Sequence, residues 1–150
     1  MTVWGIGPAV AASGVITAAI ACFAGNELHC GYDFIPPYAA KASGSVLACL
    51  GFWLWLDAVI RLTKARRCGI LAKTGAYAVV RHPVYAAFIV FVVPGLSLLF
   101  NNWLMLGASV VMFAVFKARI NREEEFLENS FTSEYREYKK KVRQLIPYVF

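Results

Sequence analysis

Long apolar runs without charge dominate the sequence and restrict what it can fold into. Residues 3–24 contain no charged side chain, and further apolar runs cover residues 44–62, 84–100 and 103–118. A helix of about 20 apolar residues crosses the ~30 Å hydrocarbon layer of a bilayer. Charged residues make up only 16% of the chain, against roughly a quarter in a soluble domain. The sequence therefore predicts an all-α integral-membrane bundle of four transmembrane helices, one for each run.

A fifth helix is expected at residues 121–143, which completes a single domain over residues 1–150. Acidic side chains gather at its start and basic ones near its end, which complements the helix dipole. Apolar side chains recur every three or four residues along it, at Leu127, Phe131, Tyr135, Tyr138 and Val142. Such a helix is amphipathic, and we expect it to lie against the cytoplasmic ends of the spans.

The basic residues indicate how the chain is oriented. Fourteen of the fifteen lysine and arginine residues lie at or beyond Arg61, and the two within apolar runs, Arg61 and Lys117, lie at the ends of those runs. Because basic residues beside spans stay on the cytoplasmic side and attract anionic headgroups, we expect a multi-pass protein with both termini and the site inside, in contact with membrane lipids. Nucleic acid is not an expected partner, since no aromatic residues alternate with the basic ones. The cysteines lack metal-ligand spacing, so no metal site is expected.

Two polar clusters at the predicted cytoplasmic side are candidates for chemistry. The first is Arg81-His82-Pro83-Val84-Tyr85, and the second begins at Arg119 and includes Glu123 and Glu124. A turn at Asn101-Asn102 makes the third and fourth spans antiparallel and so brings the two clusters together. A basic, proline-fixed corner opposite an acidic segment forms a pocket with charges of both signs.

S-adenosylmethionine has a matching distribution of charge. Its carboxylate is bound by arginine or backbone N–H groups and its ammonium and ribose hydroxyls by carboxylates. Its adenine is bound by aromatic walls such as Tyr77, Tyr85 or Tyr135. Methyl transfer needs mainly in-line positioning of donor and acceptor, without a metal or a covalent intermediate. The residues by themselves predict the pocket of mixed charge and no specific reaction.

Several of these residues also form motifs that resemble those of a known family. The motifs are Gly75-Ala76-Tyr77, the segment 81–85, Glu123-Glu124 with Leu127, and a tail with Phe131, Glu134-Tyr135, Tyr138 and Ile146-Pro147. Over about residues 71–147 the chain is similar to the isoprenylcysteine carboxyl methyltransferase and phospholipid methyltransferase family of integral-membrane enzymes.

The resemblance implies a membrane-embedded S-adenosylmethionine site and a hydrophobic or lipid-like acceptor that enters from the bilayer. It implies cofactor-binding roles for Tyr77, Arg81, His82, Pro83, Tyr85, Glu123 and Glu124. The tyrosines would form walls, and the His82-Pro83 segment would hold the cofactor partly through backbone groups. The resemblance also implies that Arg119 and Glu124 are the catalytic pair that orients the acceptor.

Three positions depart from the usual pattern of the family. Ala76 replaces the usual proline, Ala87 replaces a usual glycine, and Thr132 replaces the glycine that normally follows the phenylalanine of the tail. Glycine adopts positive φ readily, whereas threonine does not. The third departure therefore bears on the local bend of the tail and leaves the reaction class unchanged.

Other functions and plainer roles stay open at this point. A membrane reductase of the sterol reductase type uses NADPH and carries a similar Arg-His-x-x-Tyr element, and a four-span protein need not be an enzyme. His82 can cap a helix start before a proline, Arg119 can be a positive-inside anchor, and Asp57 can pair with Arg61 one turn away. The acceptor is open too, because a carboxylate needs no base whereas an amine must first lose a proton.

Overall fold

The structure, a computed structural model, describes residues 6–146 apart from the side chain of Asn26. This described part is all-helical, with 81% of its residues in helix and no strand, so the expected all-α class is confirmed. Its elements in chain order are α1 (Gly7–Leu28), α2 (Pro37–Cys68), α3 (Ala76–Val79), α4 (Pro83–Ala86), η1 (Ala87–Val92), α5 (Val93–Leu99), η2 (Trp103–Met105) and α6 (Leu106–Lys141).

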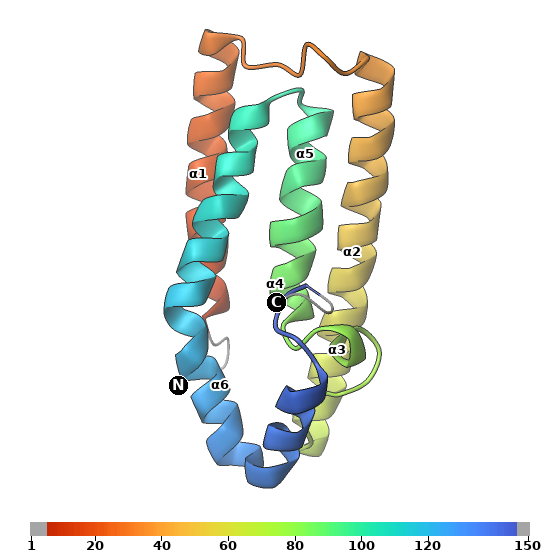
Figure 1. Cartoon of the computed structure of the whole chain (residues 1–150), viewed down its shortest axis with the longest axis vertical. Coiled ribbons are helices and arrows are strands. Elements are labelled where there is room, and N and C mark those ends of the chain that lie inside the picture. The colour runs from red at the N-terminus through yellow and green to blue at the C-terminus, as the bar shows by residue number, and fades with distance from the viewer. Residues whose placement is uncertain (1–5, 147–150) are drawn as a thin grey trace.

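The long helices run side by side and alternate in direction along the chain (Figure 1). α1 packs against α6, and α2 packs against α5. The segments α4, η1 and α5 follow one another as a single rod that contacts both α2 and α6. The start of α1, the connection between α2 and α4, and the end of α6 all lie at the lower end in Figure 1. The two predicted polar clusters belong to this end.

Three helices within the described residues are long and apolar enough to cross a membrane. They are Gly7–Gly25, Pro37–Cys68 and Trp103–Lys141. The third predicted span, residues 84–100, corresponds to the shorter apolar helix Pro83–Leu99. Length and composition therefore support the first, second and fourth expected spans. The helix at the third position, Pro83–Leu99, is shorter than the others.

Glycines allow α2 and α5 to approach closely. A Cβ atom on Gly44 would lie 2.8 Å from the carbonyl oxygen of Gly95, and one on Gly95 would lie 2.8 Å from the amide nitrogen of Ala48. Small residues permit such contacts between helices in membranes. The π-helical turn of η1 directly precedes α5, where Pro94 lacks an N–H group to donate to an α-helical ladder.

The turn between α5 and α6 is built by two asparagines, as the sequence predicts. Asn101 adopts φ 49°, a conformation that asparagine tolerates better than most residues. The side chain of Asn102 accepts a hydrogen bond from the Leu104 amide at 3.1 Å and donates one to the Ala21 carbonyl at 2.9 Å. The hydroxyl of Ser97 donates to the Asn102 carbonyl at 2.8 Å. The turn therefore holds α5 and α6 antiparallel and also attaches the end of α1.

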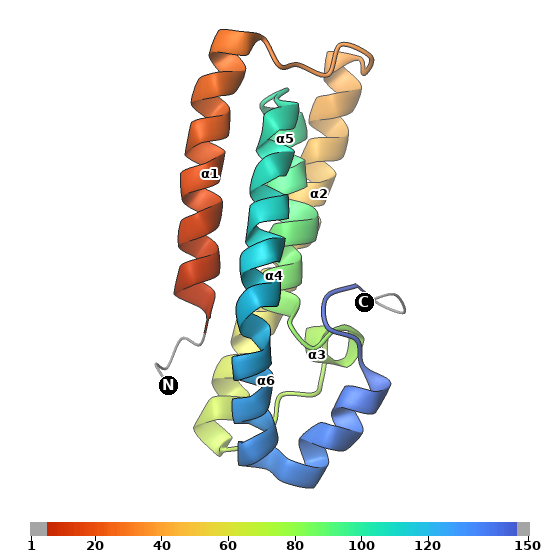
Figure 2. The same ribbon diagram turned by 60° about the vertical axis from the view of Figure 1, so that its left-hand side comes forward.

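No new helix begins at residue 121, which corrects the predicted boundary between a fourth span and a separate tail helix over residues 121–143. α6 continues beyond its apolar part because residues 117–131 contain neither glycine nor proline. The break lies instead at Thr132, where φ is 35° and ψ is −104°. Residues 133–141, the return limb of α6, then turn back toward the bundle (Figure 2). The chain therefore bends at Thr132, although threonine replaces the glycine that is usual at this position in the family.

Replacing Thr132 with glycine is expected to raise the melting temperature of the protein in detergent. A β-branched residue in this region of positive φ is strained by about 1–3 kcal/mol, and glycine removes the strain although it adds freedom to the unfolded chain. Thr132→Ala is the matched control, because alanine keeps the Cβ atom that causes the strain. Thermal unfolding of the three proteins measures the effect, and a Thr132→Gly protein that melts no higher than the alanine variant would contradict it.

Candidate functional site

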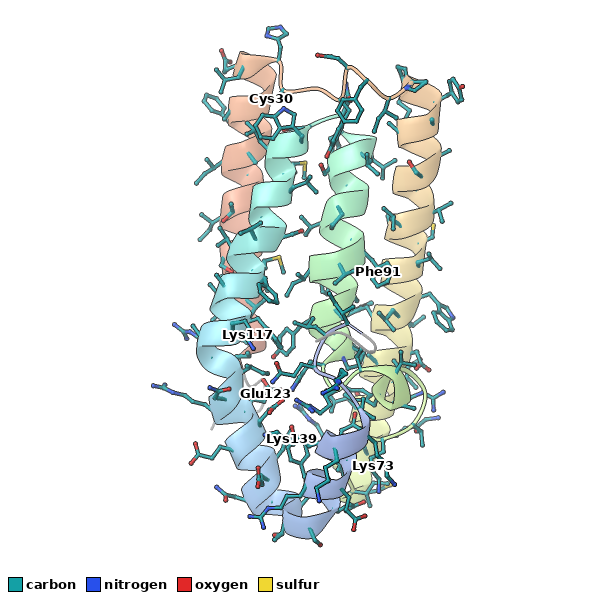
Figure 3. All side chains as sticks on the ribbon, viewed as in Figure 1. Cys30, Lys73, Phe91, Lys117, Glu123 and Lys139 are labelled. Atoms are coloured by element: carbon teal, nitrogen blue, oxygen red, sulfur yellow. The ribbon has the colours of Figure 1, made fainter. Side chains whose placement is uncertain are left out.

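The hairpin of α5 and α6 brings the His-Pro corner, residues 81–83, against the paired glutamates of α6. Arg81, His82 and Glu124 are all buried, although each carries an ionisable side chain. Figure 3 shows Glu123 and Lys139 in the same region, near the lower end of the bundle. The predicted meeting of the two polar clusters is therefore observed, and the roles of their residues toward a ligand stay predictions.

Glu124 lies at the centre of this cluster and is only 4% exposed. Its Oε1 atom accepts hydrogen bonds from Arg81 Nη2 at 2.8 Å and from Gln144 Nε2 at 2.9 Å. The same oxygen lies 3.3 Å from His82 Nε2. Its Oε2 atom lies 3.0 Å from Lys139 Nζ. One carboxylate thus joins the His-Pro corner, the return limb and residues 142–146. From here on, the word tail refers only to residues 142–146, which follow α6.

The surroundings of Glu124 favour its charged form. The carboxyl lies beyond the apolar part of α6, which ends at Phe116. Burial opposes its ionisation, but hydrogen bonds from His82, Gln144 and Lys139 and the charge of Arg81 outweigh this and hold the pKa of Glu124 well below its usual range. A carboxylate held in this way is a poor proton acceptor near neutral pH.

Arg81 also attaches the tail through the backbone. Its Nη1 atom donates to the carbonyls of Lys139 at 3.0 Å and Val142 at 2.8 Å. The amide of Arg81 donates to the Arg143 carbonyl at 2.7 Å, and the amide of His82 donates to the Gln144 carbonyl at 3.0 Å. Four of the five guanidinium N–H groups are used in this way or by Glu124. Arg81 therefore holds the fold together whatever else it binds.

Glu123 is less enclosed than its neighbour. Its Oε2 atom accepts a hydrogen bond from the Tyr85 hydroxyl at 3.0 Å and one from the Ile6 amide at 3.5 Å. Its Oε1 atom accepts none from the residues that the structure describes. The rings of Tyr85 and Phe116 have centroids 5.3 Å apart, and that of His82 lies 5.6 Å from Phe116. A half-buried carboxylate with a free oxygen thus stands beside an aromatic wall.

Tyr77 lies in the short helix α3. Its ring is buried with Ala58 and Ala76, and its carbonyl accepts a hydrogen bond from the Tyr138 hydroxyl at 2.5 Å. Burial raises the pKa of the Tyr77 hydroxyl, which therefore stays protonated. Tyr77 can supply a wall and a hydrogen bond to a ligand, but not a negative charge.

Arg119 is not brought to Glu124, its expected catalytic partner. The two residues are five positions apart on one helix and so point about 140° away from each other. Arg119 is exposed and Glu124 is buried. Arg119 forms no hydrogen bond or ion pair with the described residues, and its role in orienting an acceptor remains a prediction.

Two further residues join the cluster that the sequence did not point to as site residues. Lys139 and Gln144 reach Glu124 from the return limb and the tail, and no local pattern links them to it. The hydroxyl of Tyr135 is buried without a hydrogen-bond partner among the described residues. Its predicted role was to pack or to form a wall. Buried hydroxyls without a partner are rare, and one beside this cluster is suited to a ligand.

A polar cavity of about 350 Å³ lies between α6 and its return limb. It is lined by Asn121, Glu124, Glu125, Glu128, Asn129, Arg136 and Lys139. Glu124 and Lys139 therefore lie at the boundary between the buried cluster and a space that a polar ligand can enter.

The cluster fits S-adenosylmethionine by the chemistry of its groups. The free oxygen of Glu123 suits an ammonium or a ribose hydroxyl, and the unpartnered hydroxyl of Tyr135 suits a second polar atom. Tyr85 and Phe116 supply an apolar wall for an adenine ring. The backbone of His82 is less free than expected, because its N–H and C=O groups already bond Gln144 and Ala86.

Residues 50–129 match the model of the isoprenylcysteine carboxyl methyltransferase family. A protein-S-isoprenylcysteine O-methyltransferase of Schizosaccharomyces pombe is 33% identical over 121 residues, which cover 75% of this chain and 50% of the relative. The chain belongs to the isoprenylcysteine carboxyl methyltransferase family. The matched region includes every residue to which the resemblance assigns a cofactor-binding or catalytic role, from Tyr77 to Glu124.

Other members of this family show similar agreement. A protein-S-isoprenylcysteine O-methyltransferase of Saccharomyces cerevisiae is 37% identical over 87 residues, which cover 58% of this chain and 36% of the relative. Protein-S-isoprenylcysteine O-methyltransferase B of Arabidopsis thaliana is 33% identical over 79 residues, 53% of this chain and 40% of the relative. The chain spans about half the length, or less, of these curated relatives. No solved structure matches it.

Replacing Glu124 with glutamine is expected to destabilise the protein by about 3 kcal/mol, because loss of the carboxylate leaves Arg81 buried without its counter-charge. The tail should also loosen, so hydrogen exchange of the Arg81 and His82 amides should accelerate. Glu125→Gln is the matched control, since Glu125 is the next residue of α6 and is exposed. Thermal unfolding and hydrogen exchange report both effects. Equal behaviour of the two variants would refute the central role of Glu124.

Proposed function

We propose that this chain is an S-adenosylmethionine-dependent methyltransferase that methylates a lipid-like acceptor at the cytoplasmic surface of a membrane. The observation that supports this most directly is the buried cluster of Arg81, His82 and Glu124 beside Glu123, whose Oε1 atom accepts no hydrogen bond from the described residues. This cluster belongs to a chain that is a member of the isoprenylcysteine carboxyl methyltransferase family and whose relatives are named protein-S-isoprenylcysteine O-methyltransferases. The favoured acceptor is accordingly the carboxylate of a prenylated cysteine.

The adjacent glutamates divide the work in this proposal. Glu123 binds the ammonium or ribose of the cofactor through its free oxygen, while Glu124 holds the His-Pro corner and the tail in place. Tyr85 and Tyr77 form the walls, and the Tyr135 hydroxyl donates to a cofactor atom. Pro83 fixes the direction in which the chain leaves the corner. S-adenosylmethionine supplies a methyl group on a positively charged sulfur.

A carboxylate acceptor agrees better with the cluster than an amine does. A carboxylate is ionised at neutral pH and attacks the methyl group without losing a proton, whereas an amine needs a base. Glu124 is unsuited to be that base, because Arg81 and Lys139 stabilise its charged form. The amine of a phospholipid is the alternative acceptor, with Glu123 as the remaining carboxylate.

The proposed membrane arrangement has four spans with both termini on the cytoplasmic side. The shorter helix Pro83–Leu99 is the third span, since it is antiparallel to its neighbours α2 and α6 and packs along both. The end of the bundle that holds the candidate site also carries the basic connection after α2 and the basic return limb, which are retained on the cytoplasmic side. A hydrophobic acceptor then enters sideways from the bilayer.

The purified protein is expected to bind S-adenosylmethionine and S-adenosylhomocysteine in detergent. Glu123→Gln and Tyr85→Phe should each weaken binding by about tenfold, which corresponds to ~1.4 kcal/mol. Glutamine removes the negative charge that attracts the ammonium group, and phenylalanine removes the hydroxyl that holds Glu123 in place. Glu125→Gln should bind as the wild type does. Titration calorimetry measures these affinities. The proposal fails if neither compound binds, or if NADPH binds in their place.

The acceptor can be identified by the chemical stability of the product. With methyl-labelled cofactor, a prenylated N-acetylcysteine should acquire label that alkali releases, because a methyl ester is cleaved by base. The same compound with its carboxyl group amidated should acquire none. Label on phosphatidylethanolamine that survives alkali would instead identify an amine acceptor and overturn the carboxylate assignment.

A further inference from the structure

Asp57 lies inside α2 and bonds a backbone amide outside its own helix. Its Oδ2 atom accepts a hydrogen bond from the Ala76 amide at 2.8 Å. Both of its oxygens also accept from Arg61 Nε, at 2.7 and 2.9 Å. Arg61 in turn donates through Nη1 to the Thr74 hydroxyl at 3.2 Å. A pair of charges one helical turn apart therefore holds the loop that leads into α3.

The same loop is shaped to receive Arg61. Gly75 adopts φ 60° and ψ −127°, a conformation that favours glycine. A Cβ atom at this position would lie 1.8 Å from Arg61 Nε. The guanidinium thus occupies the space that any other residue at position 75 would need for its side chain.

The other flank of α3 is held by the return limb. The Tyr138 hydroxyl donates to the Tyr77 carbonyl, while the Tyr77 ring packs on Ala58 of α2. α3 has only four residues, too few to be stable alone. The position of α3 therefore depends on contacts with other segments, above all the hydrogen bonds with Asp57 on one side and with Tyr138 on the other.

We propose that Asp57 is a positioning residue for the cofactor site. Its carboxylate fixes the first amide of α3 and thereby holds Tyr77 in the wall that the proposed function assigns to it. The inference rests on that proposed function. It assigns Asp57 more than the neutralisation of Arg61, since a simple ion pair between them does not require the Ala76 amide.

The geometry allows this role to be separated from a charge effect. Asparagine at position 57 retains a side-chain oxygen that can accept the Ala76 N–H group, but it loses the ion pair with Arg61. Ala76 is the first residue of α3, a position where proline is well tolerated because its N–H group is not needed by the helix. Proline at position 76 fixes φ by its ring, but its Cδ atom takes the place of the N–H group that points at Asp57 Oδ2. The ring therefore fits only when the carboxylate is removed, as in D57A.

The test compares D57A, D57N, A76P and the double variant D57A/A76P. The affinity for S-adenosylhomocysteine, measured by calorimetry in detergent, should fall about tenfold in D57A and stay within about threefold of wild type in D57N. It should also fall in A76P, because the proline ring displaces the Asp57 carboxylate. The double variant should recover to within about threefold of wild type, because removing the carboxylate makes room for the ring that fixes α3. Asp33→Ala is the matched control, because Asp33 is exposed at the opposite end of the bundle.

Hydrogen exchange of the Ala76 amide supplies a readout that does not need the cofactor. This amide should be protected in the wild type and in D57N, and should exchange faster in D57A. If the wild type binds no cofactor, the proposed function fails while exchange still decides whether Asp57 holds α3. The inference is overturned if D57A leaves binding or exchange unchanged, if D57N behaves as D57A does, or if proline fails to restore binding. Should D57A not fold, the double variant D57A/A76P decides the question: binding within about threefold of wild type supports the inference, and lost binding overturns it.

Discussion

The buried carboxylate of Glu124 is the interaction on which the arrangement of the lower end depends. A buried charge is tolerated only where partners and hydrogen bonds compensate it, and here the partners come from separate parts of the chain. Arg81 and His82 precede α4, Lys139 lies on the return limb, and Gln144 lies in the tail. Because these partners come from the hairpin, the return limb and the tail, the position of the tail is coupled to the closure of the hairpin. Apolar packing contributes as well, because Leu145 of the tail is buried in the main hydrophobic core.

The parts of the fold that could be predicted are those governed by local chemistry. Runs without charge reveal helices of bilayer length, and the Asn101-Asn102 pair reveals a turn because asparagine tolerates positive φ. The antiparallel hairpin then follows, and with it the meeting of the His-Pro corner and Glu124. Each step uses only neighbouring residues and the geometry of a helix. The number of spans is harder to predict from the sequence, because the helix Pro83–Leu99 is short for a transmembrane helix.

The parts that could not be predicted are of two kinds. Some depend on contacts between residues far apart in the sequence, and one depends on a backbone conformation that its residue type rarely adopts. The change from apolar to polar composition near residue 120 resembles a helix boundary, yet nothing there stops the helix and α6 continues. The true bend is at Thr132, where a β-branched residue adopts a conformation suited to glycine. Lys139 and Gln144 reach Glu124 only because of that bend. No spacing in the sequence connects them to it.

The neighbouring glutamates illustrate how a helix gives adjacent residues different tasks. Consecutive positions point about 100° apart around the axis, so Glu124 faces the His-Pro corner while Glu123 faces Tyr85 and the start of α1. Glu124 is saturated by cations and amide donors from its own chain. Glu123 keeps one oxygen free of the described residues. A ligand bound by Glu123 therefore approaches from the side of α1 and Tyr85, and the pairing of the two glutamates separates this binding from the maintenance of the fold.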